Sequence, residues 1–423
     1  MADGTNLIDG VEFSADKKTL IRFPEESELT EYVIPDGVKK IAYEAFEGCT
    51  SLQSLKIAES VVEFDSWVFK SCTSLKSVTI PDSVKKADRS IFEGCTCLES
   101  VVISRSMKKI EMNLFEGCIR LKSVVIPDGI KEIAVEAFKD CTSLETVVLP
   151  VSVTKIDDSA FEGCTGLKSL TVTENVTKIG RGAFAKTSVQ IKLSNNPRFE
   201  VDRCGALIHK KTETLLYVPC RCKEYDIPDG VKKINDLTFC GCSNLKSVKI
   251  PDSVTEIGDS VFDDCIRLKS IEIPNSVKKL SWNVFSNCAS LESVCISNRV
   301  NEIPPFAFEN CTSLRSVIIP KSVRNIMVRA FSGCSALETV IIPEGVREIQ
   351  TTAFEKNIEL KSIIIPASVE RIFPYAFINC VNLESVKILG DMTKVDHSAF
   401  TGCPCENQVK KDYQHLFTEI PII

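Results

Sequence analysis

The hydrophobic positions of the chain recur every 23 residues. One row of this pattern, IPDGVKKIAYEAFEGCTSLQSLK, covers residues 34–56, and another, IPDSVTEIGDSVFDDCIRLKSIE, covers residues 250–272. One phenylalanine per row identifies 15 repeats in two arrays: Phe46, Phe69, Phe92, Phe115, Phe138, Phe161 and Phe184, then Phe239, Phe262, Phe285, Phe308, Phe331, Phe354, Phe377 and Phe400. Because so short a unit cannot bury its own apolar face, stacked neighbours must share one core, which predicts a repeat solenoid.

The end of each row predicts a short strand. Apolar residues alternate with polar ones there, as at Leu75, Val78 and Ile80, so the Val and Ile side chains point inward. The proline that follows, such as Pro81, has no backbone N–H and ends the strand. The return segment, Val-x-x-Ile-x-x-x-Ala-Phe, fits a short helical or irregular turn, with a strand as the alternative. The stacked rows predict one long parallel β-sheet and a column of phenylalanine rings in the opposite wall.

A non-repeat island divides the solenoid. Phe184 and Phe239 are 55 residues apart, which is 32 more than one repeat. Segments 10–35 and 205–228 resemble each other, and each predicts a β-hairpin with a charged turn, at Asp16–Lys18 and at Lys210–Thr212. The predicted segments are a hairpin cap at 1–33, a first array at 34–186, a β-hairpin island at 187–226, a second array at 227–403 and a C-terminal cap at 404–423. In this last cap, a short helix is predicted from Lys410 to Phe417, with Tyr413, Leu416 and Phe417 covering the final rung.

Cysteine occupies one fixed position of the repeat, three residues after the phenylalanine. Thirteen cysteines do so: Cys49, Cys72, Cys95, Cys118, Cys141, Cys164, Cys242, Cys265, Cys288, Cys311, Cys334, Cys380 and Cys403. Asn357 takes this place in one row. We interpret the column as a ladder of buried thiols, with disulfides between rungs as the alternative.

Four cysteines outside the column, Cys204, Cys220, Cys222 and Cys240, gather at the island, where Cys220-x-Cys222 and Cys240-x-Cys242 face the same boundary. These cysteines could be plain free thiols, form a local disulfide or bind zinc, and we leave the three alternatives open. Zinc sites favour Cys-x-x-Cys spacing over Cys-x-Cys.

The row IPDSVxxIxxxxFxxCxxLxSVxI, which covers about four-fifths of the chain, resembles the BspA-like leucine-rich repeat family, also called the Treponema pallidum type. The resemblance implies a leucine-rich-repeat superhelix or horseshoe, and a role in adhesion or in binding host or surface proteins. It carries over no catalytic residue. It also implies a cell-surface or secreted location, whereas the polar start, MADGTNLIDG, and the many free cysteines favour the cytoplasm. The location stays open between these two.

Charge and composition argue against several other classes. There are 51 Lys and Arg against 57 Asp and Glu, a net charge of −6, so no basic footprint for nucleic acid is expected. The Lys-Lys doublets, such as Lys39–Lys40 and Lys85–Lys86, lie close to acidic residues and predict a solvated edge. Only three histidines are present, and no hydrolase, phosphate-binding or metalloprotease motif occurs. We therefore expect no enzymatic activity, no cofactor, no metal and no membrane insertion.

The outward face of the predicted sheet is the most informative surface. One outward column is Ser or Thr in nearly every row, which suits cross-strand contacts. The next outward column contains three consecutive apolar residues in each array: Val102, Val125 and Val148, then Ile318, Ile341 and Ile364. Contiguous exposed apolar residues mark interaction surfaces, although β-branched residues also simply favour strands. These six residues are the predicted protein-binding candidates of a non-enzymatic binding protein, and an intracellular scaffold or a self-associating structural protein is the alternative.

Overall fold

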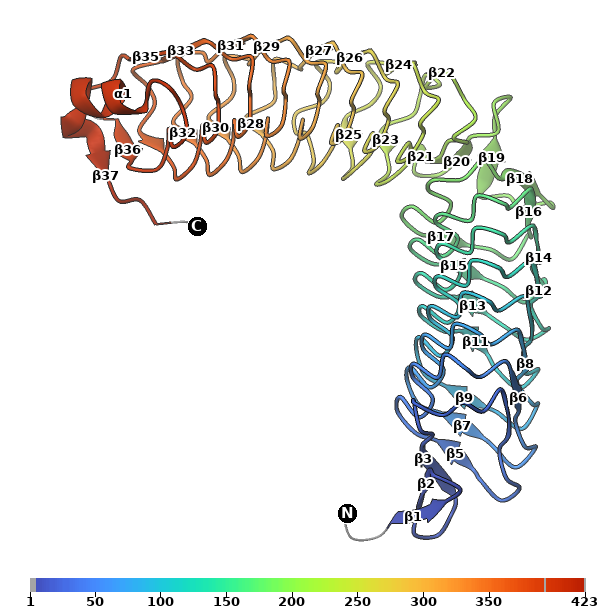
Figure 1. Cartoon of the computed structure of the whole chain (residues 1–423). Helices are drawn as coiled ribbons and strands as arrows, with labels where there is room; N and C mark the ends of the chain where they lie inside the picture. Colours follow the sequence, from blue (N-terminus) through green and yellow to red (C-terminus); the bar gives the residue numbers. More distant parts are fainter. Residues whose placement is uncertain (1–4, 392, 422–423) are drawn as a thin grey trace. The chain divides into compact units, whose positions relative to one another are not determined.

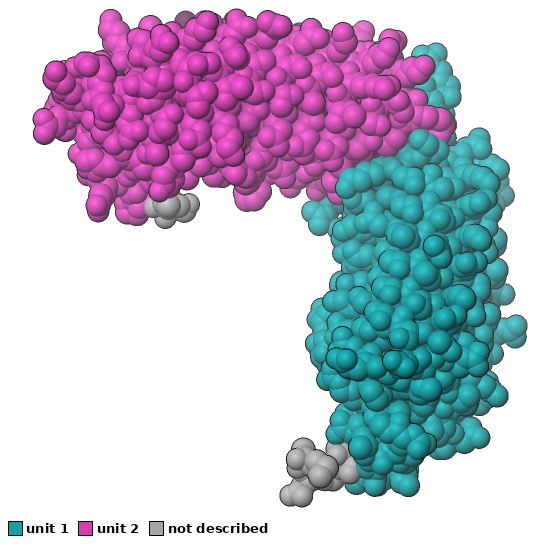
Figure 2. Space-filling model, viewed as in Figure 1, with its two compact units in different colours: residues 1–207 teal, residues 208–423 magenta. Residues whose placement is uncertain are grey.

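The computed structural model describes residues 5–391 and 393–421. The chain divides into two compact units, residues 1–207 and residues 208–423 (Figure 2). The division falls inside the predicted island of residues 187–226. Each unit is a stack of turns of about 23 residues, so the predicted repeat solenoid is confirmed (Figure 1).

Unit 1 carries two rows of parallel strands on opposite walls of the stack. The first row is one eight-stranded sheet made of β4 (Glu31–Val33), β6 (Ser54–Lys56), β8 (Ser77–Thr79), β10 (Ser100–Val102), β12 (Ser123–Val125), β14 (Thr146–Val148), β16 (Ser169–Val172) and β18 (Gln190–Leu193). The second row contains two-residue strands: β5 (Lys40–Ile41), β7 (Glu63–Phe64), β9 (Lys86–Ala87), β11 (Lys109–Ile110), β13 (Glu132–Ile133), β15 (Lys155–Ile156) and β17 (Lys178–Ile179). The return segment therefore contains a strand, the alternative to a helical turn. β19 (Phe199–Val201) follows the last rung.

Unit 2 repeats the two rows. Its first row forms four strand pairs: β22 (Glu224–Asp226) with β24 (Ser247–Lys249), β26 (Ser270–Glu272) with β27 (Ser293–Cys295), β29 (Ser316–Ile318) with β31 (Thr339–Ile341), and β33 (Ser362–Ile365) with β35 (Ser385–Ile388). Its second row contains β23 (Lys233–Ile234), β25 (Glu256–Ile257), β28 (Glu302–Ile303), β30 (Asn325–Ile326), β32 (Glu348–Ile349), β34 (Arg371–Ile372) and β36 (Lys394–Asp396). Hydrogen bonding along the first row is thus continuous in unit 1 and interrupted between pairs in unit 2.

A small antiparallel module begins the stack in unit 1. The predicted hairpin is formed by β2 (Val11–Ser14) and β3 (Thr19–Arg22), and β1 (Thr5–Ile8) adds an antiparallel strand that the sequence pattern did not predict. β3 then pairs in parallel with β5, which joins the module to the second row. In unit 2, β20 (Leu207–His209) and β21 (Thr214–Tyr217) are neighbours in the same way, and β21 pairs in parallel with β23. The two modules therefore start their arrays by the same connection.

The core of each unit contains a column of stacked phenylalanine rings. Centroids of consecutive rings lie 5.3 to 6.0 Å apart from Phe69 to Phe184, and 5.0 to 5.4 Å apart from Phe239 to Phe400. These rings are fully buried, and most inward Leu, Val and Ile residues of neighbouring turns are buried with them. Stacking of identical residues in register is what lets each short turn share the core of its neighbours.

The cysteine column lies beside the rings, and the predicted ladder of buried free thiols is confirmed. Eleven of its thiols donate a hydrogen bond to the carbonyl oxygen of the column phenylalanine one turn earlier, with Sγ–O distances of 2.9 to 3.2 Å, for example Cys118 to Phe92. Within the second array, Asn357 interrupts the column; it is completely buried, and its side-chain nitrogen and oxygen have no hydrogen-bond partner. A thiol fits this position better because it is a small, largely apolar group with a single donor.

The end of unit 2 is covered by a short helix that begins earlier than predicted. α1 spans Glu406–Asp412, followed by a 3-10 turn, η1 (Gln414–Leu416), and by β37 (Phe417–Thr418), which pairs with β36. The prediction of a helix from Lys410 to Phe417 was therefore wrong in its bounds. The Glu406 carboxylate accepts a hydrogen bond from the Gly402 N–H and pairs with Lys410 at 2.7 Å, and these contacts fix the earlier start. Leu416 is buried as expected, Tyr413 and Phe417 are half-buried, and Val409 completes the cover.

Candidate functional site

The six candidate side chains lie on the outer face of the first-row strands. Val102, Val125 and Val148 are 59%, 71% and 64% exposed, and Ile318, Ile341 and Ile364 are 70%, 60% and 57% exposed. We call these sets the Val stripe and the Ile stripe. The preceding residue of each strand points inward and is buried, for example Val317 beside Ile318. The predicted inward and outward columns are thus confirmed, whereas the binding role of the six residues stays a prediction.

Strand register brings the members of each stripe together. Val125 is paired with Val148 across β12 and β14, and Ile318 is paired with Ile341 across β29 and β31. Neighbouring strands of a sheet lie about 4.8 Å apart, so these side chains contact one another along the face. In each stripe, two of the three residues are thus register partners on paired strands, and the third occupies the same outward position of the adjacent turn.

Several charged residues beside the stripes are paired with one another. Three positions before the stripe column, Lys122 pairs with Glu99 at 3.4 Å and Arg315 pairs with Glu338 at 3.2 Å, each pair joining adjacent turns. Exposed pairs of this kind add little stability, but they cancel local charge. The charges beside Ile318 and Ile341 therefore cancel, which favours contact of these two residues with an apolar rather than a strongly charged partner surface.

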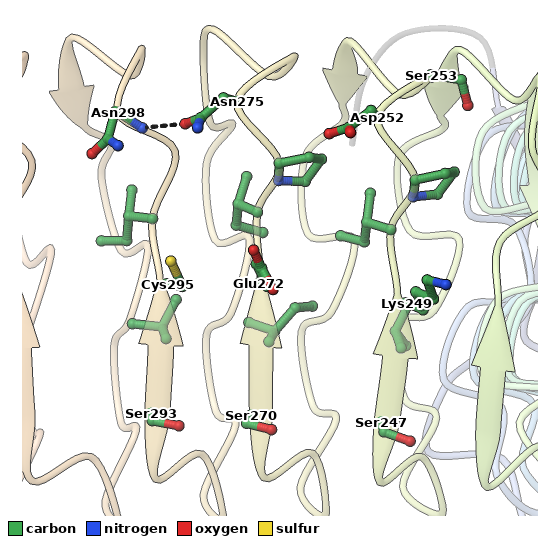
Figure 3. Close-up of a pocket in the computed structure, with 18 of the residues that line it drawn as sticks. Ser247, Lys249, Asp252, Ser253, Ser270, Glu272, Asn275, Ser293, Cys295 and Asn298 are labelled. Atoms are coloured by element: carbon green, nitrogen blue, oxygen red, sulfur yellow. Dashed lines mark hydrogen bonds between the residues drawn. The ribbon is translucent and has the colours of Figure 1, made fainter.

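A groove that the sequence pattern did not predict lies on the same face of unit 2, over β24, β26 and β27. Its volume is about 940 Å³, and Lys249, Glu272 and Cys295 line its middle (Figure 3). Ser247, Ser270 and Ser293 line it at the start of the strands. The serines belong to the Ser/Thr outward column, whereas Lys249, Glu272 and Cys295 occupy the same outward column as Ile318, Ile341 and Ile364. Hydroxyl groups beside a cation and a carboxylate suit a polar segment, so the face of unit 2 combines a polar groove with an apolar strip.

The lysine doublets are largely neutralised by acidic neighbours. Lys40 pairs with Glu63 at 3.4 Å and with Asp65 at 2.8 Å, and Lys86 pairs with Glu63 at 2.7 Å. Hydrogen bonding to Asp65 raises the pKa of Lys40, and a hydrogen bond from Lys86 lowers the pKa of Glu63. The second-row strands therefore carry a ladder of mixed charge rather than a basic stripe.

The carboxylate pair Asp157–Asp158 is held by basic neighbours. Burial works to raise the pKa of Asp157, but hydrogen bonding to Lys155 at 2.5 Å outweighs it and the pKa is lowered. Asp158 pairs with Arg181 at 3.0 Å. Asp157 therefore serves as an ion-pair partner within its own turn, and Asp158 pairs with the adjacent turn.

The four cysteines at the start of the second array come close together in part. The Cys242 thiol donates a hydrogen bond to the Cys220 sulfur, at a distance of 3.2 Å between the two Sγ atoms. That hydrogen bond, together with burial, raises the pKa of Cys242 well above its ordinary value. Among the described residues, no group of three or more His, Cys, Asp or Glu side chains is arranged to hold a metal ion. Within the same residues, no helix is long and apolar enough to cross a membrane.

Two stacked rows of short parallel strands, with a consensus leucine, phenylalanine and cysteine in most turns, define a leucine-rich-repeat protein. The family model described as the BspA type leucine rich repeat region matches residues 22–145, 89–198, 213–327 and 301–410. The chain therefore belongs to the BspA-type leucine-rich repeat family.

Solved structures agree with this assignment. A leucine rich cell surface protein from Faecalibacterium prausnitzii is 28% identical, with a TM-score of 0.59, and the match covers 92% of this chain and 96% of that one. A leucine-rich repeat protein from Eubacterium ventriosum is 19% identical, with a TM-score of 0.55 and coverage of 95% and 94%, and shares the fold. The search of curated proteins found no match.

Proposed function

We propose that this chain is a non-enzymatic protein-binding solenoid that acts in adhesion or in attachment to host or surface proteins, and that it binds through the outward face of unit 2. Membership of the BspA-type family supports a binding role. The likeness to a bacterial leucine rich cell surface protein supports a location at the cell surface.

The observation that carries the proposal is the exposure of the Ile stripe. Ile318, Ile341 and Ile364 remain 57% to 70% exposed, although the inward residues of the same strands are buried. Water-exposed isoleucine side chains in adjacent rows are removed from water when a partner covers them, which contributes about 25 cal/mol per Å² of apolar area. A fixed sheet face also loses little conformational entropy on binding, because its backbone is already ordered.

The test is a binding screen with matched variants. The full chain is measured against a panel of purified, immobilised host extracellular-matrix and serum proteins by biolayer interferometry. Changing Ile318, Ile341 and Ile364 together to Thr retains β-branching but removes apolar area, so binding should fall more than about tenfold with an unchanged melting temperature. The same triple change at Val102, Val125 and Val148 is the control and should have a smaller effect. Equal binding by both triple variants and the unaltered chain would overturn the proposal for this face.

Self-association is the second function that the Ile stripe could support, because the stripes of two copies of the chain can cover each other. Sedimentation of the purified chain distinguishes the two functions. A concentration-dependent dimer that disappears in the Ile-to-Thr triple variant would favour the structural, self-associating role over adhesion.

A further inference from the structure

The thiol pair at the start of the second array differs from the thiols of the column. Column thiols donate to a phenylalanine carbonyl at 2.9 to 3.2 Å, as Cys265 does to Phe239 at 3.2 Å. The nearest carbonyl contact of Cys242 is longer, 3.7 Å to Val218, and its closer partner is the Cys220 sulfur at 3.2 Å. The sulfur of Cys220 is likewise 3.9 Å from the Cys240 carbonyl. The distance between the two sulfurs is therefore shorter than the distance from either sulfur to its backbone carbonyl oxygen.

The local backbone keeps this pair in place. Cys220 lies in the turn after β21, where the Cys222 N–H donates to the Pro219 carbonyl at 3.0 Å. Cys242 lies one turn later, where its N–H donates to Phe239 at 3.0 Å. The Asn244 amide reaches back to the Cys220 carbonyl at 3.4 Å. Two neighbouring turns that are hydrogen-bonded to each other thus present their sulfurs across a single gap.

The equivalent junction of unit 1 lacks such a pair. The residue after the module proline is Glu25 there, whereas it is Cys220 in unit 2. Cys49, the first column thiol of unit 1, has its pKa raised to about 12 by burial, by the neighbouring Cys72 and by Glu25. The same architecture therefore carries a carboxylate beside the first column thiol in one unit and a second thiol in the other.

We propose that Cys220 and Cys242 are a redox-modifiable pair that forms a disulfide when a low-molecular-weight disulfide oxidises the chain. A disulfide requires a sulfur–sulfur distance of about 2.05 Å, so the sulfurs need to approach by only about 1 Å. The half-buried Cys220 faces solvent more than Cys242, which is 1% exposed, and is the first to react. The crosslink would join the island module covalently to the first rung of the second array.

The reaction balances as two thiol–disulfide exchanges. The Cys220 thiolate attacks one sulfur of the oxidant, the oxidant's S–S bond breaks, and one half leaves as a thiolate. Cys242 then loses its proton and attacks the Cys220 sulfur of the mixed disulfide, which expels the second half of the oxidant. The cysteines lose two electrons and two protons, and the oxidant becomes two thiols. Because the Cys242 thiol is held protonated, the second step should accelerate as the pH rises.

The test uses the reduced full chain with oxidised glutathione as the probe. After incubation under native conditions, free thiols are alkylated in denaturant and peptides are mapped by mass spectrometry. We expect a crosslinked peptide joining Cys220 to Cys242, with column thiols such as Cys95 and the unit 1 counterpart Cys49 still alkylated. Cys220→Ser should abolish this crosslink, and Cys222→Ser, a neighbouring half-buried thiol, should retain it.

Thiol alkylation and circular dichroism provide two further checks. Alkylation of Cys220 should fall more than tenfold on oxidation and recover with dithiothreitol, while alkylation of Cys97, a half-buried thiol of unit 1, should not change. Circular dichroism of both serine variants checks that each remains folded. Cys220 and Cys242 alkylated as fully as Cys95 after oxidation, or a dominant crosslink through Cys222 or Cys240, would overturn the assignment. These outcomes do not depend on the proposed binding function.

Discussion

The Val stripe of unit 1 and the Ile stripe of unit 2 are built in the same way but differ in the size of the side chain. Both lie one residue beyond a buried strand position, in three consecutive turns, and are exposed to similar degrees. Each isoleucine adds one methylene to the valine of the other stripe. Burial of a methylene contributes about 0.8 kcal/mol, so three contribute up to about 2.4 kcal/mol, or roughly 50-fold in affinity.

The two stripes also differ in their surroundings. The Ile stripe follows β27 in the row order of unit 2, and the polar groove with Lys249, Glu272 and Cys295 lies over the strands up to β27. A repeated scaffold can therefore provide the same geometry twice, while the residues at single outward positions decide which copy is suited to a partner.

The largest expected effect comes from placing a charge in the middle of the Ile stripe. Ile341→Lys should reduce partner binding by more than about 100-fold, because a buried unpaired ammonium group loses its hydration. The fold should tolerate the change, since Lys249 and Lys387 already occupy this outward column in unit 2. Biolayer interferometry and a thermal melt measure the two effects.

The inward neighbour provides the matched control for that variant. Val340 is 9% exposed, so Val340→Lys should destabilise the chain by more than about 3 kcal/mol, as measured by chemical denaturation. A large loss of stability from Ile341→Lys, with little from Val340→Lys, would show that the inward and outward faces had been exchanged.

Alkaline pH should weaken both units through the thiol column. Burial raises the pKa of Cys49 and of Cys334 to about 12, above the value of about 8.5 of a thiol in an unfolded chain. The folded state therefore holds protons that the unfolded state releases, so stability is full below about pH 8.5 and declines as the pH rises toward 12. Melting temperatures across this range should fall progressively, and constant values would contradict the buried ladder.

A smaller effect is expected at the interruption of the column. Asn357→Cys replaces an amide that has no hydrogen-bond partner with the residue found at this place in thirteen of the fifteen rows, and should stabilise the chain by about 1–3 kcal/mol. Chemical denaturation measures the gain. Cys334→Asn, which creates the same defect one turn earlier, should produce a loss of similar size. If neither variant changed the free energy of unfolding, the thiol ladder would not contribute to stability.

Much of the fold could be predicted from the sequence because the repeat imposes it. The 23-residue spacing placed the phenylalanine column, the buried thiols and the outward stripe residues without any structure. The sequence did not decide between a strand and a helical turn in the second row, because two residues, such as Lys40–Ile41, are too few to show an alternating pattern. The start of α1 was missed because it depends on local contacts of Glu406 that no periodicity records.

The parts of the site that could not be predicted depend on contacts between turns with irregular spacing. Cys220 and Cys242 are 22 residues apart, one fewer than the repeat, because the island shifts the register at this point. The groove over β24, β26 and β27 is formed jointly by side chains of three turns, which the pattern of a single row does not show. The stripe residues were identifiable because their position and chemistry both follow the repeat.

The most direct test of the central claim is an exchange of the two stripes within one chain. Val102, Val125 and Val148 are changed to Ile, and Ile318, Ile341 and Ile364 are changed to Val. Hydroxyl-radical footprinting of the chain bound to its partner from the screen then shows which strands become protected. The account predicts protection over β29, β31 and β33 in the unaltered chain and a shift toward β10, β12 and β14 after the exchange. Protection that never includes either stripe, or an affinity unchanged by the exchange with protection confined to the polar groove, would contradict it.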